Sequence, residues 1–391
     1  MEKTLTTFLR GKIHVHQPAS GYRFNIDSVC LASFSWVRAG ESVLDLGTGS
    51  GILLLLLAHF HLPVSLLGVE LQPELAELAS RNFEENGWSA LGRAVAADFR
   101  KPGAFPEGAL ELAVCNPPYY EAGRGLPSPD DSRAMARHSL SAGLADVLSA
   151  GARALKAGGR LCLLCPAPRF SELLASAPAA GLNPHVVRWV RSSPASEPHL
   201  ALVQFRKEAL QSPVTLLPLT LRENSGDYSS EVALWLGERE PPEPRFLCDV
   251  MVGRLARYLR LAGLDAAYTN RAEDEWLLAQ ARRSGRVLIT RDRPLLARCK
   301  KERVRAFDPG SDVPRDQLAR VREAFRMEAE HSPRCMDCDA PVLEVERREA
   351  LGKVPPYTYL THERFSACPC CGKLTWEGSH LARFQAMLKA L

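Results

Sequence analysis

The sequence lacks any apolar run long enough to cross a membrane and any pattern that marks a chain for secretion. Its longest apolar stretch, GILLLLLAHFHLPV at residues 51–64, is far shorter than the roughly twenty residues that a membrane-spanning helix needs. The opening residues, MEKTLTTFLRGKIHVHQ, contain neither an apolar segment nor a small-residue cleavage site. We therefore expect a cytoplasmic protein with no membrane partner, and a buried helix within residues 51–64.

Internal repeats are also missing, and so is a strong net charge. The formal net charge of +4 over 391 residues does not identify a nucleic-acid-binding protein. The distribution is uneven, however, because residues 282–305 contain ten lysines and arginines against only two acidic residues, Asp292 and Glu302. A local basic field of this kind suits a phosphate backbone, so RNA is a candidate partner.

The order of apolar and polar segments predicts an α/β protein with more than one domain. Strand patterns alternate with helical patterns from SVLDLG to RLCLLCP, which is typical of a mostly parallel, doubly wound sheet. A second α/β pattern, with strands RFLCDV, RVLIT and RVRAFD, follows the charged, proline-rich segment EREPPEP. Cysteines and short strands prevail near the C-terminus. The expected division is a first domain at 1–237, a linker at 238–244, a second domain at 245–328 and a small cysteine-rich domain at 329–391.

A glycine-rich turn follows the first strand of this pattern. The segment VLDLGTGSG contains Asp45, Gly47, Gly49 and Gly51. Glycines let a ligand approach the backbone closely, and a following helix offers unpaired N–H groups. The G-x-G-x-G spacing, with an acid two residues before it, resembles motif I of the S-adenosylmethionine-dependent methyltransferases. That resemblance implies S-adenosylmethionine as cofactor, bound by these four residues.

Two more acids stand at the ends of the next strands. Glu70 ends LLGVE, where a carboxylate can accept ribose hydroxyls, and Asp98 ends the third strand, where it can accept an adenine amino group. Each acid alone could be a solvated strand end. Because ligands of open α/β sheets bind at the carboxyl ends of the strands, we interpret the acids together as a cofactor site.

The strand ELAVC runs directly into Asn116, Pro117, Pro118 and Tyr119. Proline has no N–H and holds the preceding residue extended, so Asn116 is presented stiffly at a strand end. A rigid loop without chemistry would use the same residues. The tetrapeptide NPPY resembles the motif of methyltransferases that act on the amino group of adenine, cytosine, guanine or glutamine. It implies that the Asn116 side-chain oxygen and the Pro117 carbonyl accept the two N–H groups, that Asn116 also lies against the cofactor, and that Tyr119 stacks on the planar substrate.

A wider resemblance narrows the substrate. The segments GYRFNIDSVCLASF, ARHSLSAGLADVLSAGARALKAGGRLCLLCP and LRENSGDYSSEV resemble the bacterial tRNA(Val) adenine-N6 methyltransferase family over residues 11–237. The resemblance implies a Rossmann-like class I methyltransferase acting on an adenine amino group in RNA, with tRNA expected, and Phe24 and Asp27 closing over the cofactor. From the residues alone, Phe24 could pack in the core and Asp27 could cap a helix. The alternative activity is methylation of protein glutamine.

Three aspartates mark the second α/β pattern. Asp249 ends the strand RFLC, Asp274 starts a helix, and Asp292 follows the strand RVLIT. Carboxylates from separate strand ends can hold Mg²⁺ or Mn²⁺, and such a metal can activate water against a phosphodiester. Each aspartate by itself could equally be a helix cap or a turn residue.

The C-terminal part also has a family resemblance. The segments DVMVGRLARYLRLAG, VLITRDRPLL, CMDC and CPCC, from residue 245 onward, resemble the Mut7-C-type RNase domain, a PIN-like fold joined to a zinc ribbon. The resemblance implies metal-dependent RNA cleavage with Asp249, Asp274 and Asp292 as the matching acids. A catalytically silent module that only grips RNA is the alternative. Together the two resemblances predict a bifunctional RNA-processing protein.

Four of the eleven cysteines form two C-x-x-C pairs, which is the spacing of a zinc site. Cys335 and Cys338 with Cys368 and Cys371 would complete a closed tetrahedral site, which is structural because it leaves no position for a catalytic water. Cys370 could replace one ligand. We expect a β-hairpin around VPPYTYL at residues 354–360 to bridge the long interval between the pairs.

Overall fold

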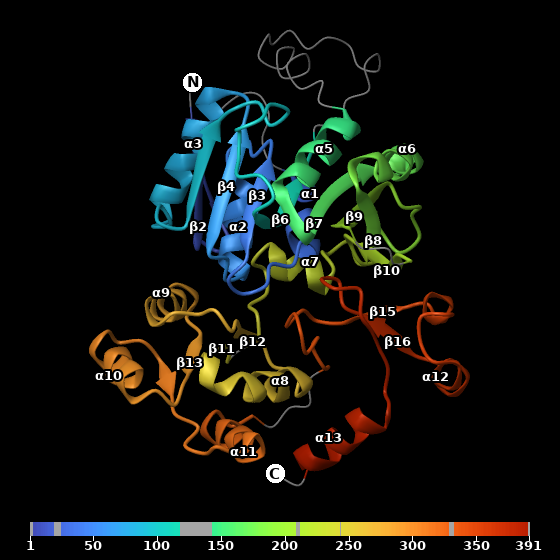
Figure 1. The fold of residues 1–391 in the computed structure, drawn as a ribbon. Helices are drawn as coiled ribbons and strands as arrows, with labels where there is room; N and C mark the ends of the chain where they lie inside the picture. Colours follow the sequence, from blue (N-terminus) through green and yellow to red (C-terminus); the bar gives the residue numbers. More distant parts are fainter. Residues whose placement is uncertain are drawn as a thin grey trace. The chain divides into compact units, whose positions relative to one another are not determined.

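The computed structural model describes residues 3–18, 25–117, 143–208, 212–242, 244–327 and 332–389. The chain divides into two compact units (Figure 1). The first comprises residues 1–37, 41–58 and 63–240, and the second comprises residues 241–391 with the segments 38–40 and 59–62. No helix among the described residues is both long and apolar enough to cross a membrane.

The first unit is built on an eight-stranded sheet with the order β10-β8-β9-β7-β6-β3-β4-β5. Its strands are β3 (Ser42–Leu46), β4 (Ser65–Glu70), β5 (Gly92–Ala96), β6 (Leu110–Cys115), β7 (Leu155–Pro166), β8 (Leu182–Arg191), β9 (Leu200–Lys207) and β10 (Val214–Thr220). The strands from β7 to β5 are parallel, and β9 is antiparallel to both of its neighbours. The predicted Rossmann-like sheet is therefore confirmed.

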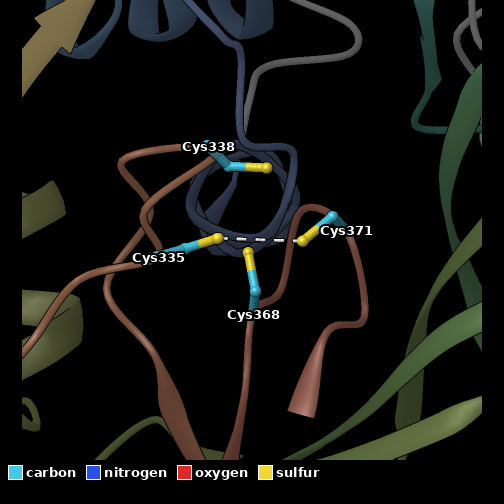
Figure 2. A group of neighbouring side chains, drawn as sticks. All are labelled: Cys335, Cys338, Cys368 and Cys371. Carbon is cyan, nitrogen blue, oxygen red and sulfur yellow. Dashed lines mark hydrogen bonds between the residues drawn. The ribbon is translucent and has the colours of Figure 1, made fainter. Parts of the chain in front are cut away.

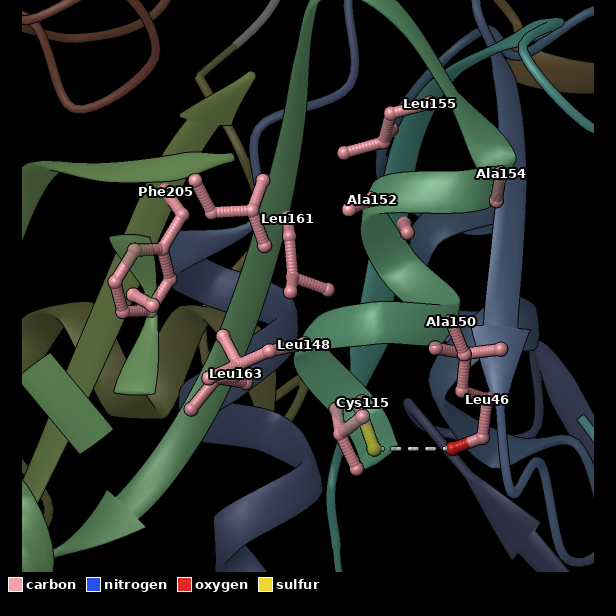
Figure 3. Packing of buried hydrophobic residues seen from close by; sticks show 14 of the residues in the cluster. Leu46, Cys115, Leu148, Ala150, Ala152, Ala154, Leu155, Leu161, Leu163 and Phe205 are labelled. Atoms are coloured by element: carbon pink, nitrogen blue, oxygen red, sulfur yellow. Dashed lines mark hydrogen bonds between the residues drawn. The ribbon is translucent and has the colours of Figure 1, made fainter. Parts of the chain in front are cut away.

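Helices cover this sheet. They are α1 (Ile26–Phe34), α2 (Ile52–Phe60), α3 (Pro73–Glu85), α5 (Leu144–Ala154), α6 (Phe170–Ser176) and α7 (Ser230–Trp235), with one-turn 3-10 helices at Ala167–Arg169 and Pro178–Ala180. The long apolar run forms α2, whose residues 52–58 are all buried, as expected. Helix α5 can lie close to β7 because Gly151 has no Cβ. A Cβ at this position would stand only 2.8 Å from the Leu161 side chain. Leu148, Leu161 and Phe205 contribute to the core there (Figure 3).

An antiparallel hairpin of β1 (Lys3–Phe8) and β2 (Ile13–Pro18) precedes the large sheet. Its second strand lies against α3. The hairpin is therefore a small second sheet of the first unit, and it lies next to α3.

The second unit contains a parallel sheet with the order β12-β11-β13-β14. The strands are β11 (Phe246–Cys248), β12 (Ala266–Tyr268), β13 (Val287–Ile289) and β14 (Ala306–Phe307). The helices are η3 (Val250–Val252), α8 (Gly253–Leu261), α9 (Asp274–Ser284), α10 (Arg293–Lys301) and α11 (Pro314–Ala324). The parallel α/β pattern is as predicted, whereas β12 was not foreseen because two of its three residues are alanines, a residue type depleted in strands.

The cysteine-rich segment forms a small antiparallel sheet of β15 (Leu343–Val345), β16 (Phe365–Ala367) and β17 (Leu374–Thr375). The prediction of a β-hairpin around VPPYTYL is wrong. That stretch forms the helix α12 (Pro356–Thr361) after a 3-10 turn, η4 (Arg347–Ala350). Pro356 at the first helical position explains the difference, since its fixed φ favours helix initiation and its missing N–H costs nothing there.

The last helix, α13 (Ser379–Lys389), returns to the core of the PIN-like part. The Phe384 ring meets Tyr258 of α8 edge to face, with 5.5 Å between the ring centroids. Phe384 belongs to the same buried cluster as Phe246 and Leu259. The chain after residue 329 therefore contributes both the small sheet and a piece of the preceding domain's core.

Candidate active sites and metal centre

The glycine-rich turn after β3 has the backbone that its sequence predicts. Gly47, Gly49 and Gly51 all have positive φ, at 78°, 55° and 83°. A Cβ on Gly47 or Gly49 would meet nothing within 4 Å, whereas one on Gly51 would stand 3.2 Å from the Ala79 Cβ of α3. The first two glycines thus face open space that a ligand can enter, and the third permits close packing of the turn on α3.

Asp45 and Glu70 brace this turn from the ends of two adjacent parallel strands. The buried Asp45 carboxylate accepts a hydrogen bond of 2.8 Å from Thr48 Oγ1. Burial, together with the nearby charge of Glu70 and against the opposing hydrogen bond from Thr48, raises the pKa of Asp45 to about 7. Glu70 Oε2 accepts from the Gly49 N–H at 2.9 Å, and Oε1 accepts from the Gln72 N–H at 3.0 Å. The turn is therefore held in place before any ligand arrives.

Asp98 lies beyond β5 and is joined to a different partner. Both of its carboxylate oxygens accept from the Arg100 side chain, at 2.8 to 3.1 Å, and Oδ1 also accepts from the Arg100 N–H. The Arg100 side-chain bonds hold the pKa of Asp98 below its usual value. Its predicted role toward an adenine stays a prediction, because no bond connects it to Asp45 or Glu70 in the described structure.

The predicted acceptor residue Asn116 follows β6, next to β3 in the sheet. Its Nδ2 donates to the buried Ser28 Oγ of α1 at 3.2 Å. This bond fixes the orientation of the amide, and the described residues place no hydrogen-bond donor on Oδ1. Pro117 is buried beside it. Ser28 had no signal in the sequence that separated it from other serines.

The N-terminus of α1 corrects one alternative for Asp27. The helix cap is Asn25, whose Oδ1 accepts from the Asp27 N–H at 3.1 Å. Asp27 lies in the first turn and accepts from Asn25 Nδ2 at 2.8 Å. Asp27 is thus no cap, and its predicted contact with the cofactor stays a prediction. Phe24 and Tyr119 lie outside the described residues.

The residues at and around the glycine-rich turn fit S-adenosylmethionine. Gly47 and Gly49 leave backbone open to a ligand, and the carboxylates of Asp45 and Glu70 stand beside them. Each ionised carboxylate oxygen has two lone pairs, so Glu70 can hold the turn and still accept a ribose hydroxyl. Asn116 lies at the end of the neighbouring strand, where an acceptor group would meet the cofactor.

In the second unit, Asp249 and Asp292 are linked through a residue that the sequence did not suggest. The buried Asp249 Oδ2 accepts from Thr290 Oγ1 at 2.7 Å, and the same Oγ1 accepts from the Asp292 N–H at 3.0 Å. Asp292 also caps α10, since its Oδ1 accepts from the Leu295 N–H at 2.9 Å. The adjacent parallel strands β11 and β13 bring these residues together.

Asp274 is not gathered as closely. It is exposed in the first turn of α9. Among the described residues, only the four cysteines form a group of three or more metal-ligating side chains with all ligand atoms within 4.8 Å. The three aspartates therefore do not form a compact metal site in this structure, and a nuclease metal stays a prediction.

The four predicted cysteines do meet. The sulfur atoms of Cys335, Cys338, Cys368 and Cys371 all lie within 4.8 Å of one another and face a common centre (Figure 2). Cys335 Sγ is 3.8 Å from Cys371 Sγ, and Zn–S bonds of about 2.3 Å in a tetrahedron imply sulfurs roughly 3.8 Å apart. The Cys370 N–H donates to Cys368 Sγ at 3.4 Å, and its own sulfur is not in the group. The cluster fits a structural zinc ion.

Buried charges join the turn at Cys335–Cys338, which we call the first cysteine knuckle, to the parallel sheet of the second unit. The buried Arg260 of α8 donates from Nη1 to the Met336 carbonyl at 2.6 Å and from Nε to the Ala266 carbonyl at 2.9 Å. Asp339 Oδ1 accepts from the Ala266 N–H at 3.2 Å. The knuckle is therefore tied to β12 and α8 by polar groups that are costly to leave unpaired.

The basic run at residues 282–305 is less free than its composition suggests. Four of its arginines form ion pairs: Arg282 with Glu302, Arg286 with Asp265, Arg291 with Asp312, and Arg298 with Glu275. Five other basic residues are exposed, namely Arg293, Lys300, Lys301, Arg303 and Arg305. The basic charge available to a partner is therefore smaller than the count of ten suggests.

Two family models match the chain. Residues 22–166 match the methyltransferase small domain, and residues 244–388 match the Mut7-C RNAse domain. Both matches agree with the resemblances found in the sequence, and the second one spans the PIN-like part and the cysteine cluster as a single domain.

Relatives with curated names match the first unit. A tRNA1(Val) (adenine(37)-N6)-methyltransferase of Tolumonas auensis is 30% identical over 226 residues, which cover 58% of this chain and 92% of the relative. One of the same name from Shewanella baltica is 29% identical over 224 residues, covering 56% and 92%. Among solved structures, a predicted O-methyltransferase from Agrobacterium tumefaciens has a TM-score of 0.44 and 21% identity, covering 55% of this chain and 96% of that one.

Proposed function

Because the chain belongs to the tRNA1(Val) (adenine(37)-N6)-methyltransferase family, we propose that its first unit methylates the exocyclic amino group of an adenine in RNA, with tRNA as the substrate. The chain has the fold and the S-adenosylmethionine-dependent class of that family. The adenine and the tRNA are our proposal, which the names of the relatives support.

In this proposal the cofactor lies at the glycine-rich turn. Gly47 and Gly49 bind it through their open backbone, and Asp45 and Glu70 through their carboxylates. Gly51 supports the turn from α3, and Asp98, Phe24 and Asp27 complete the predicted set. S-adenosylmethionine supplies an electrophilic methyl group when it is bound.

Asn116 carries the proposal. An adenine amino nitrogen is a weak nucleophile because its lone pair is delocalised into the ring. Accepting its two N–H groups on Asn116 Oδ1 and the Pro117 carbonyl favours a pyramidal nitrogen, so these bonds strengthen as the methyl group is transferred. The Ser28 bond to Asn116 Nδ2 supports this role, since it keeps the amide oxygen available as the acceptor.

The test is methyl transfer from labelled S-adenosylmethionine into unmodified tRNA by the full chain. Asn116→Ala should reduce the rate by at least about 100-fold, as expected when a transition-state acceptor is lost. Ser28→Ala should reduce it by about 10-fold or less, because Asn116 remains but its orientation is no longer fixed. Equal rates for the wild type and Asn116→Ala would overturn the assignment of Asn116.

We propose a second activity, metal-dependent RNA cleavage, at the carboxyl edge of the second sheet. It is supported by the buried Asp249, linked through Thr290 to Asp292, and by the Mut7-C RNAse match. The two carboxylates, with Asp274 of α9, would hold Mg²⁺ or Mn²⁺, which prefer oxygen ligands. The metal would activate water and steady the leaving oxygen of the phosphodiester.

Manganese-dependent cleavage of a labelled RNA tests this second proposal. The wild type should cut the RNA, and Asp249→Asn and Asp292→Asn should each lose cleavage while retaining RNA binding. If the wild type binds RNA but cuts none under any divalent metal, the second unit is a silent RNA-binding module and the proposal is wrong.

A further inference from the structure

The outer edge of strand β2 is paired with one side chain of helix α3, Asn82, and with that of its C-cap residue, Asn86. Asn86 Oδ1 accepts from the His14 N–H at 2.9 Å, and Asn86 Nδ2 donates to the His14 carbonyl at 2.7 Å. Asn82 pairs with His16 in the same way: its Oδ1 accepts from the His16 N–H at 2.7 Å, and its Nδ2 donates to the His16 carbonyl at 3.0 Å. Each asparagine therefore offers one donor and one acceptor to the strand, as a neighbouring strand would.

The spacing of the two asparagines explains how a helix can serve as the partner of a strand. Four residues along a helix rise about 6.0 Å, and two residues along a strand rise about 6.8 Å. Asn82 of α3 and Asn86, the residue that caps the C-terminus of α3, are four positions apart, and His14 and His16 are two apart in β2. Successive amides of the helix thus meet successive outward-facing peptide groups of the strand, and β1 pairs with the other edge.

Only one of the two asparagines also reaches the glycine-rich turn. Asn82 Nδ2 donates its second hydrogen to the Ser50 carbonyl at 2.8 Å, whereas the second hydrogen of Asn86 goes to the Asn82 carbonyl within α3. Asn82 is fully buried, so its three hydrogen bonds to other elements have no water to replace them. Ser50 lies between Gly49, whose N–H Glu70 holds, and Gly51, which packs on Ala79.

We propose that Asn82 is a positioning residue for the cofactor, because it holds the Ser50 carbonyl and so fixes the glycine-rich turn against the N-terminal hairpin. Glu70 holds the turn on one side, through Gly49, and Asn82 holds it on the other. This inference rests on the proposed placement of S-adenosylmethionine at that turn. It adds a consequence: since one side chain joins the turn and β2, cofactor binding and docking of the hairpin stabilise each other.

Binding of S-adenosylhomocysteine to the full chain, measured by calorimetry, tests the proposal without any turnover. Asn82→Ala should weaken binding by about 10-fold, since a buried carbonyl in the turn loses its donor. Asn86→Ala is the matched control, because it releases the same strand at His14 but does not touch Ser50. It should bind within about 2-fold of the wild type.

Hydrogen exchange provides an independent readout. S-adenosylhomocysteine should slow exchange of β2 amides in the wild type and not in Asn82→Ala. Asn82→Asp serves if the alanine variant does not fold, because it keeps the acceptor for the His16 N–H and loses both donors. It should weaken binding as Asn82→Ala does.

The possible outcomes distinguish the proposed role of Asn82 from the proposed cofactor site on which it rests. No binding by the folded wild type would overturn the proposed cofactor site itself. Normal wild-type binding with equal affinity for Asn82→Ala, or equal losses for Asn82→Ala and Asn86→Ala, would overturn the role of Asn82 alone, because the Ser50 bond would then contribute nothing specific.

Discussion

The glycine-rich turn of the first unit and the aspartate pair of the second unit occupy the same kind of place, the carboxyl ends of adjacent parallel strands, but they are held differently. Glu70, Thr48 and Asn82 each hold the turn through separate hydrogen bonds. Asp249 and Asp292 share one hydroxyl, that of Thr290. The sheet topology thus places these polar side chains at the carboxyl edge of each sheet. The local hydrogen bonds then determine which side chains form a site and how strongly one substitution disrupts it.

The largest expected effect concerns the cysteine cluster, which has no counterpart among the described residues of the first unit. Cys338→Ser should abolish stoichiometric zinc and lower the melting temperature of the second unit by more than about 10 °C, because structural zinc contributes on the order of 10 kcal/mol to folding. Elemental analysis and calorimetric melting of the full chain measure both.

Cys370→Ser is the matched control for the cluster, since Cys370 is buried between two ligands and lies outside the group. It should retain one zinc ion per chain. Zinc loss in this variant together with zinc retention in Cys338→Ser would show that the ligand assignment is wrong.

The next prediction concerns Asp45 of the first site, whose ionised form is disfavoured by burial. Its pKa in the folded chain, about 7, lies above the ordinary 3.8. The folded state therefore binds the proton more tightly, and this contribution to stability is complete below about pH 4 and is lost as the pH rises to about 7. Asp45→Asn should equal the wild type at pH 4 and exceed it by up to roughly 4 kcal/mol at pH 8.

Urea unfolding of the wild type and of Asp45→Asn between pH 4 and pH 8 checks this prediction. The unfolding transition of the first unit is the one to be monitored. The variant should also bind S-adenosylhomocysteine more weakly, since the proposed ligand carboxylate is gone. A stability difference that does not change with pH would contradict the role of burial at Asp45.

Thr290→Val and Thr48→Val test the difference between one shared hydroxyl and several separate bonds. Thr290→Val removes the donor to Asp249 and the acceptor for the Asp292 N–H, so it should destabilise the second unit by about 2 kcal/mol and lower manganese-dependent cleavage by at least about 10-fold. Thr48→Val should weaken S-adenosylhomocysteine binding by less than about 3-fold, because the Glu70 bonds remain. Similar losses at both sites would remove the distinction.

The smallest effect concerns the basic run, where exposed and ion-paired residues should differ. Lys300→Ala with Lys301→Ala should weaken RNA binding by several-fold and reduce the salt dependence of binding by about one to two phosphate contacts. Arg298→Ala removes a residue already paired with Glu275 and should change binding by less than about 2-fold. Filter binding at several salt concentrations measures both, and equal effects would contradict a role of the exposed lysines.

Strong periodic signals in the sequence were sufficient for much of this structure. The apolar runs that become β3, β4 and β6 located Asp45, Glu70 and Asn116 at or near strand ends, and the cysteine spacing located the cluster of four cysteines. These predictions succeeded because strand burial and knuckle geometry depend on residues close together in the chain.

The remaining features depend on contacts that single residues make across the fold. Ser28, Asn82 and Thr290 are ordinary polar residues until tertiary structure brings each to its partner, 88, 66 or 41 positions away. The ion pairs that reduce the basic run, such as Arg298 with Glu275, likewise cross between helices. Local patterning cannot predict such pairs, because nothing in the neighbouring sequence distinguishes them from solvated residues.

The most direct test of the central proposal is nucleoside mass spectrometry of unmodified total tRNA after incubation with the full chain and labelled S-adenosylmethionine. The account predicts labelled N6-methyladenosine that disappears with Asn116→Ala. Label absent from RNA but present in added ribosomal protein would contradict it and would assign the Asn116 site to the amide of glutamine.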